Sequence, residues 1–136
     1  MPYEMTWLVD KRVLYIVLTG ELSADELREL VAQSRDMTDA GIKPIHAIAD
    51  ATRSHALPKH INSILKEFKQ VTPQDTGFTV IIANNALTRF FAQTLLKIMR
   101  LEVRFAPNIE ESLNILHRVD QTIPITLPQI DSSPSQ

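Results

Sequence analysis

Hydrophobic and polar positions along the chain first predict two short strands. Extended segments lie at residues 4–9 and 13–18, and the polar turn DKR joins them. A connection this short permits only an antiparallel hairpin. The second segment is apolar on both faces, which predicts a central strand that is covered on both sides.

Four later segments show the spacing of apolar residues that is typical of helices. The first opens with a capping box formed by Ser23 and Glu26, and Gly41 suits its end. Three more segments with helical spacing begin near Pro58, Ala86 and Asn108. Buried strands are predicted between these helices, at residues 45–50, 78–83 and 103–105.

This order of elements predicts an α/β fold. Strands that alternate with helices after an opening hairpin favour a mixed, mostly parallel sheet of about five strands with one antiparallel edge strand, and about four helices. The right-handed preference of crossover connections leaves only a few topologies for such a sheet.

Composition narrows the class of protein. A chain of 136 residues suits one core, and its shares of hydrophobic residues (44%) and charged residues (22%) are typical of a globular domain. The net charge of -2 argues against broad capture of nucleic acid, which needs a basic face. The chain has no cysteine, which excludes disulfides, thiol nucleophiles and thiolate zinc sites.

The ends of the sequence and its apolar runs suggest a location and a domain boundary. The first residues lack the pattern of a signal peptide, and the apolar runs fall short of the roughly 20 residues that cross a bilayer. We therefore expect a cytoplasmic protein. Residues 1–120 are predicted to form a single domain, and residues 121–136 an extension with a disordered end that is rich in proline and serine.

Three segments carry a family resemblance. They are the hairpin leading into TGELS at residue 19, the third strand ending in Ala49 and Asp50, and FAPNIEESL from residue 105. In this order they resemble the STAS superfamily, which comprises the anti-sigma-factor antagonists, sulfate-transporter tails and SpoIIAA-like relatives, over residues 3–119. The resemblance implies a non-enzymatic module that acts by binding proteins and uses no cofactor.

The resemblance also implies a regulatory hydroxyl. In the antagonists, an aspartate ends the third strand, and a serine or threonine two residues later is phosphorylated by a partner kinase. Asp50 and Thr52 stand in that relation here. The antagonists read about DSSG, whereas this chain reads DATRS, without the glycine, which favours the SpoIIAA-like branch.

The segment ADATRSHALP, residues 49–58, is predicted to be a polar loop after the third strand. Thr52 and Ser54 are its candidate phosphoacceptors, although either hydroxyl could simply cap the next helix. Asp50, Arg53 and His55 are predicted to belong to a binding surface. Of these two roles, the capping role is favoured over the phosphorylation switch.

Metal and catalytic sites are not predicted. His46, Asp50, His55 and His60 could supply ligands, but no pair of them has the helical spacing of a His-Glu-x-x-His motif. His46 is instead expected within or beside the core. Neither a Gly-x-Ser-x-Gly elbow nor a phosphate-binding glycine loop occurs, and the chain has only three glycines.

The predicted helix at residues 86–99 carries more apolar residues than one inward stripe needs. They include Leu87, Phe90, Phe91 and Leu95. The surplus fits a homodimer contact, a groove for a protein partner, a pocket for a lipid-like ligand, or burial within the monomer.

We therefore expect a STAS-like regulatory module that acts by protein–protein interaction. Its partner would be a second copy or a kinase-like regulator in bacterial signalling, with anti-sigma-factor antagonism as one role. The alternative is a carrier or sensor of a small amphipathic ligand held under the helix at residues 86–99. A hydrolase with an unfamiliar site is the third alternative.

Overall fold

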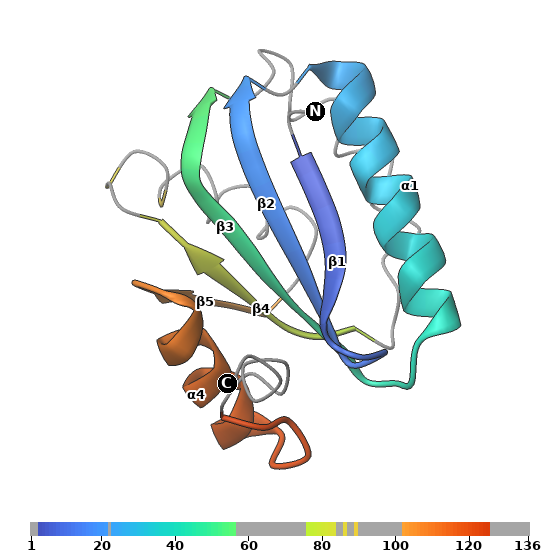
Figure 1. Ribbon diagram of the computed structural model, residues 1–136, viewed down its shortest axis with the longest axis vertical. Coiled ribbons are helices and arrows are strands. Elements are labelled where there is room, and N and C mark those ends of the chain that lie inside the picture. The colour runs from blue at the N-terminus through green and yellow to red at the C-terminus, as the bar shows by residue number, and fades with distance from the viewer. Residues whose placement is uncertain are drawn as a thin grey trace, which may run out of the picture.

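The computed structural model describes residues 3–21, 23–56, 76–83, 86, 89 and 102–125 (Figure 1). This part of the chain contains five strands and two helices. In chain order they are β1 (Tyr3–Val9), β2 (Val13–Glu21), α1 (Ala24–Ala40), β3 (Ile45–Ala56), β4 (Thr76–Ile82), β5 (Glu102–Ala106) and α4 (Ile109–Val119).

The five strands form one sheet in the order β1-β2-β3-β4-β5. β1 pairs antiparallel with β2, and the pairs β2–β3, β3–β4 and β4–β5 are parallel. The predicted mixed sheet with one antiparallel edge strand is therefore confirmed. Its parallel strands direct their carboxyl ends to one side of the sheet, where α/β proteins usually bind their ligands.

The helix starts follow the predicted caps. The Ser23 hydroxyl accepts a hydrogen bond from the Glu26 N–H, and the Glu26 carboxylate accepts one from the Ser23 N–H, which completes the capping box. At the start of α4, the Asn108 side chain accepts from the Glu111 N–H. Gly41 follows the last residue of α1, as expected.

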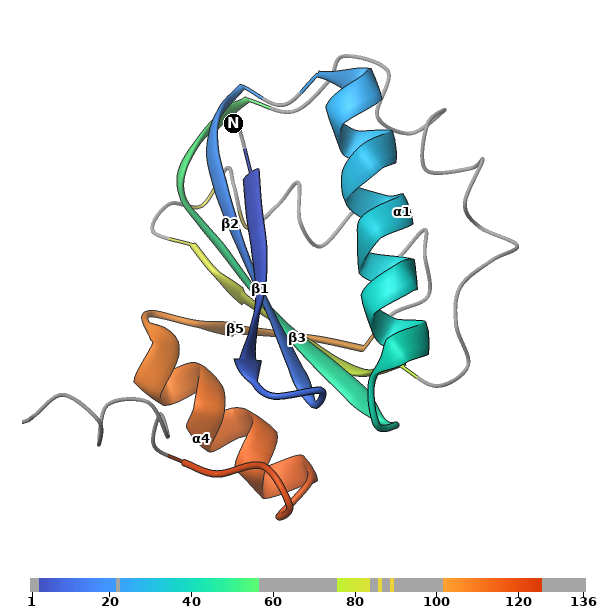
Figure 2. The same ribbon diagram turned by 45° about the vertical axis from the view of Figure 1, so that its right-hand side comes forward.

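The core has two layers, one on each face of the sheet. Side chains of a strand alternate between the faces, so Leu14 and Ile16 of β2 pack with Leu27 of α1, whereas Val13 packs with Leu113 of α4. The two helices accordingly lie on opposite sides of the sheet (Figure 2). Ile123, which follows α4, is fully buried in the same cluster as Val13.

The polar loop that was predicted after residue 50 is wrong, because β3 continues through it to Ala56. β2 likewise continues past its predicted end to Glu21. The two strands extend together: Thr19 pairs with Arg53 and Gly20 with Ser54. The polar residues suggested a loop. Where the surface of a sheet is exposed, however, the backbone hydrogen bonds between two parallel strands can form next to polar side chains as well as next to apolar ones.

The helix predicted to begin near Pro58 lies outside the described residues. Of the helix predicted at residues 86–99, only Ala86 and Arg89 are described, and both are helical. Two of the roughly four expected helices are thus described, α1 and α4. In the described part of the chain, no helix is long and apolar enough to cross a membrane.

Candidate functional site

Asp50 and Thr52 form a compact polar turn within β3. One carboxylate oxygen of Asp50, Oδ1, accepts two hydrogen bonds from Thr52: one from the backbone N–H at 2.9 Å and one from the hydroxyl at 2.6 Å. Both side chains are partly exposed. The Thr52 hydroxyl therefore has its proton directed at a carboxylate and caps no helix, which corrects the capping interpretation of this residue.

This turn coincides with a bulge in the pairing of β2 and β3. Val17 pairs with Asp50 and Thr19 pairs with Arg53, so two residues of β3 lie opposite one residue of β2. A bulge of this kind bends a strand and redirects its side chains, and it is common beside functional sites. The bonds from Thr52 to Asp50 give the extra residue local hydrogen-bond partners. The polar turn thus stabilises an irregularity near the carboxyl end of β3.

Tyr15 and Arg53 complete the site. Tyr15 and Val17 are two residues apart on β2, so their side chains lie on the same face of the strand, and Val17 pairs with Asp50. This is the face that α4 covers in part. Burial raises the pKa of the Tyr15 phenol, and the charge of Asp50 and a hydrogen bond with it raise that pKa further, while Arg53 lowers it. Arg53 itself is exposed. We call Tyr15, Asp50, Thr52 and Arg53 the β3 site.

Replacing Asp50 with asparagine is expected to lower the pKa of Tyr15. The substitution removes the negative charge that disfavours the tyrosinate, but burial still keeps the pKa above its ordinary value. Ultraviolet absorbance during an alkaline titration would measure the change, with Tyr15→Phe assigning the signal between the two tyrosines of the chain. An unchanged titration in the Asp50→Asn variant would contradict the contact.

The same raised pKa sets a dependence of stability on pH. Because the folded protein holds the proton of Tyr15 more tightly than the unfolded chain, this contribution is complete below about pH 10 and is lost as the pH rises through the pKa of the folded state.

Other predicted site residues lie beyond what the structure describes. Ser54 and His55 belong to β3, so neither stands in a loop, but their side chains are not described. Leu87, Phe90, Phe91 and Leu95, and with them the predicted contact or pocket at residues 86–99, lie outside the described residues, as does His60.

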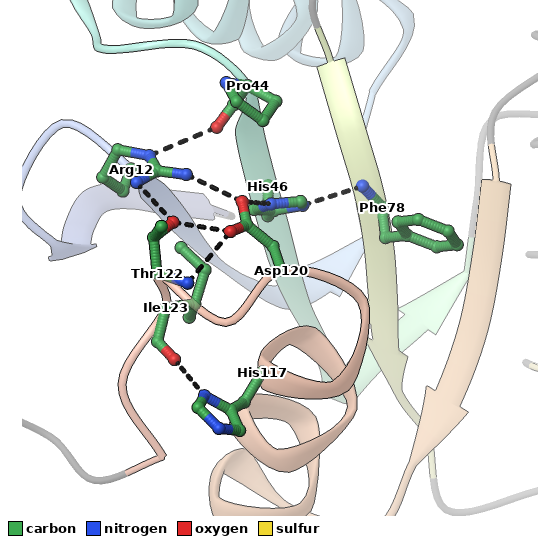
Figure 3. A network of polar contacts seen from close by, with 8 residues as sticks. All are labelled: Arg12, Pro44, His46, Phe78, His117, Asp120, Thr122 and Ile123. Carbon is green, nitrogen blue, oxygen red and sulfur yellow. Dashed lines mark hydrogen bonds and ion pairs between the residues drawn. The ribbon is translucent and has the colours of Figure 1, made fainter.

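A second polar cluster, centred on His46, lies near the amino-terminal ends of β3 and β4 (Figure 3). The Phe78 N–H donates to His46 Nδ1 at 2.9 Å, so the imidazole proton resides on Nε2 and is donated to Asp120 Oδ2, also at 2.9 Å. His46 is only 2% exposed. This confirms the expectation that His46 belongs to the core.

Asp120 is the acceptor that joins this cluster together. Its Oδ2 also accepts from Arg12 at 2.8 Å, and its Oδ1 accepts from the Thr122 N–H and hydroxyl. Hydrogen bonds from Thr122, then that from His46 and the charge of Arg12, hold the pKa of the Asp120 carboxyl far below its usual value, against the opposing effect of burial. We call Arg12, His46, Asp120 and Thr122 the Asp120 cluster.

The Asp120 cluster connects segments that are distant from one another in the sequence. Arg12 lies in the β1–β2 turn and also donates to the Pro44 carbonyl before β3, while Asp120 and Thr122 follow α4 (Figure 3). Both ring nitrogens of His46 are engaged, so neither is available for a reaction or a metal. Among the described residues, no group of three or more acidic or histidine side chains could hold a metal ion.

Sequence reasoning missed Tyr15 in the β3 site and Arg12, Asp120 and Thr122 in the second cluster. Tyr15 stands inside an apolar run, and only the register of β2 against β3 brings it near Asp50. Arg12 and Asp120 are 108 positions apart, so no local pattern could have paired them. The sequence DQT at residue 120 does carry one signal, since an aspartate two residues before a threonine favours a side-chain turn.

Comparison with known proteins identifies the fold. No protein-family model and no curated protein matches the sequence. Among solved structures, an uncharacterized protein of the DUF3478 family from Shewanella loihica PV-4, which has a SpoIIAA-like fold, is 16% identical, with a TM-score of 0.64 over 84% of this chain and 91% of that one.

Two further similar structures are of SpoIIAA itself. The anti-sigma factor antagonist SpoIIAA in its unphosphorylated form is 16% identical, with a TM-score of 0.52 over 86% of this chain and 96% of that one. The Bacillus cell fate determinant SpoIIAA in the phosphorylated form is 14% identical, with a TM-score of 0.51 over 84% and 98%. The protein is thus a mixed α/β domain of the class with a parallel sheet and an antiparallel edge strand. Its fold is SpoIIAA-like.

Proposed function

We propose that this protein is a non-enzymatic regulatory module of the STAS type, which acts by binding a protein partner through the β3 site. The observation that carries the proposal is the Thr52 hydroxyl, held 2.6 Å from Asp50 beside the exposed Arg53. The SpoIIAA-like fold supports it, because SpoIIAA is an anti-sigma factor antagonist that is known in unphosphorylated and phosphorylated forms.

Thr52 is the hydroxyl that we propose as the regulated group, ahead of Ser54. Phosphorylation would remove the proton that Thr52 donates to Asp50 and add a charge of about -1.5 to -2. The phosphate and the Asp50 carboxylate would repel each other, while Arg53 could pair with the phosphate. Modification at this position would therefore break the turn at the bulge and change the surface that a partner meets.

Affinity capture from extracts of the native host tests the binding surface. We expect the wild-type protein to retain a specific partner, and the charge reversal Arg53→Glu to reduce its recovery at least about tenfold, as expected for the loss of a charged contact. Arg118→Glu is the matched control, because Arg118 is also exposed but lies on α4, away from the β3 site. Equal recovery with both variants would place the contact elsewhere.

Peptide mapping by mass spectrometry tests the regulated hydroxyl. In protein recovered from its native cells, we expect a fraction of the peptides that contain Thr52 to carry one phosphoryl group on that residue. A phosphoryl group found only on Ser54 would move the proposed switch by two positions. Its absence from the whole peptide, in cells where the partner is also bound, would count against regulation by phosphorylation but leave the binding surface standing.

A further inference from the structure

β1 is an edge strand of the sheet (Figure 1). It pairs with β2 on one side, in continuous register from Tyr3 to Trp7. In residues 3–21, 23–56, 76–83 and 102–125, the bond from Arg12 N–H to the Val9 carbonyl is the one backbone hydrogen bond that β1 makes outside this pairing. The outward N–H and C=O groups of β1 thus form a row without partners in this part of the chain.

β1 has few of the features that prevent an edge strand from pairing, and its pairing with β2 is irregular only between Trp7 and Val9. Natural edges are commonly short or carry lysine or proline. β1 has seven residues, YEMTWLV, with neither of these, and Glu4 is its one charged residue. The other edge strand of the sheet, β5, is different: it has five residues, EVRFA, of which two are charged. Among the described residues, β1 is therefore the edge strand that is better suited to pairing.

The side chains of β1 suit pairing with a copy of itself. Tyr3 and Met5 are buried under α1, whereas Glu4 and Thr6 are exposed on the other face. In an antiparallel pair of β1 strands centred on Met5 or on Thr6, Glu4 of one copy faces a neutral residue of the other, and no like charges oppose each other. A parallel pair of β1 strands in register would instead bring the two Glu4 side chains next to each other.

We propose that β1 pairs antiparallel with β1 of a second copy, so that two five-stranded sheets join into one. This contact is separate from the β3 site and does not depend on the proposed regulatory function. A pair of seven-residue strands alone buries less than the roughly 1,200 Å² of stable interfaces. We therefore expect a dimer that dissociates on dilution.

Sedimentation velocity over a range from about 1 µM to 1 mM tests the dimer. We expect the wild-type protein to shift from monomer to dimer within that range, and Thr6→Glu to raise the dissociation constant at least about tenfold, because the new carboxylate faces Glu4 or its own copy in either register. Thr19→Glu is the matched control, an exposed threonine on the interior strand β2. A monomer at all concentrations, or a dimer that Thr6→Glu leaves unchanged, would overturn the proposal.

Cysteine crosslinking provides a second test that does not depend on affinity. The chain has no cysteine of its own, and residues opposite each other in antiparallel strands lie close enough for a disulfide. The double variant Glu4→Cys with Thr6→Cys should form a covalent dimer on mild oxidation in either register. The control pair Thr19→Cys with Glu21→Cys, on β2, should remain monomeric. Equal crosslinking of both pairs would also overturn the proposal.

Discussion

Replacing Gly77 with alanine is expected to lower the free energy of unfolding by about 3 kcal/mol. A Cβ at this position would overlap the imidazole ring of His46, at Nδ1 and Cε1. His46 cannot move aside without breaking its bonds to the Phe78 N–H and to Asp120. The expected cost combines overpacking of a buried site with the loss of a buried hydrogen bond.

A double-mutant cycle separates this clash from a general effect of alanine in β4. His46→Ala removes the ring, so Gly77→Ala should cost less than about 1 kcal/mol in that background. Denaturant unfolding of the four proteins, followed by circular dichroism, measures the difference. If Gly77→Ala costs the same with and without His46, or nothing in either background, the packing described for this ring is wrong.

Replacing Asp120 with alanine is expected to cost a similar amount, about 3 kcal/mol, because it removes the ion-pair partner of Arg12 and leaves the His46 N–H without its acceptor. Arg12 and Asp120 are only 17% and 16% exposed, so water replaces the lost contacts poorly. Asp120→Asn, which keeps a carbonyl oxygen but removes the charge, should cost less. Both losses are measured by denaturant unfolding at neutral pH.

The cost of Asp120→Asn should also depend on pH. The pKa of Asp120 is lower in the folded protein than in the unfolded chain. Its ionised form therefore stabilises the fold fully above about pH 5, and this stabilisation is lost as the pH falls below about 4. The difference in the free energy of unfolding between the wild type and Asp120→Asn should become smaller as the pH falls. A difference that stays constant as the pH falls would contradict this role of Asp120.

Much of the fold could be predicted because its signals are local. The hairpin, the capping box at Ser23 and the cap at Asn108 each depend on a few adjacent residues, and the structure has all three. The ends of β2 and β3 could not be predicted in this way. Their last residues are polar, and they are extended because each strand supplies hydrogen-bond partners to the other across the sheet.

The candidate site was predicted in composition but not in geometry. Asp50 and Thr52 were identified through the resemblance to the anti-sigma-factor antagonists, and they do interact. The sequence placed them in a loop, however, where the hydroxyl of Thr52 or Ser54 could cap a helix. The bulge between β2 and β3 and the contact with Tyr15 depend on register, which pairs residues of two strands that are separated by a helix of 17 residues.

The central claim is that a protein partner binds at the β3 site, and site-specific photocrosslinking tests it most directly. A benzophenone side chain would replace Arg53 in one variant and Arg118 in the other, both of which are exposed. After irradiation in extracts of the native host, the account predicts one specific covalent adduct from position 53 and none from position 118. Adducts from position 118 with none from position 53 would contradict it.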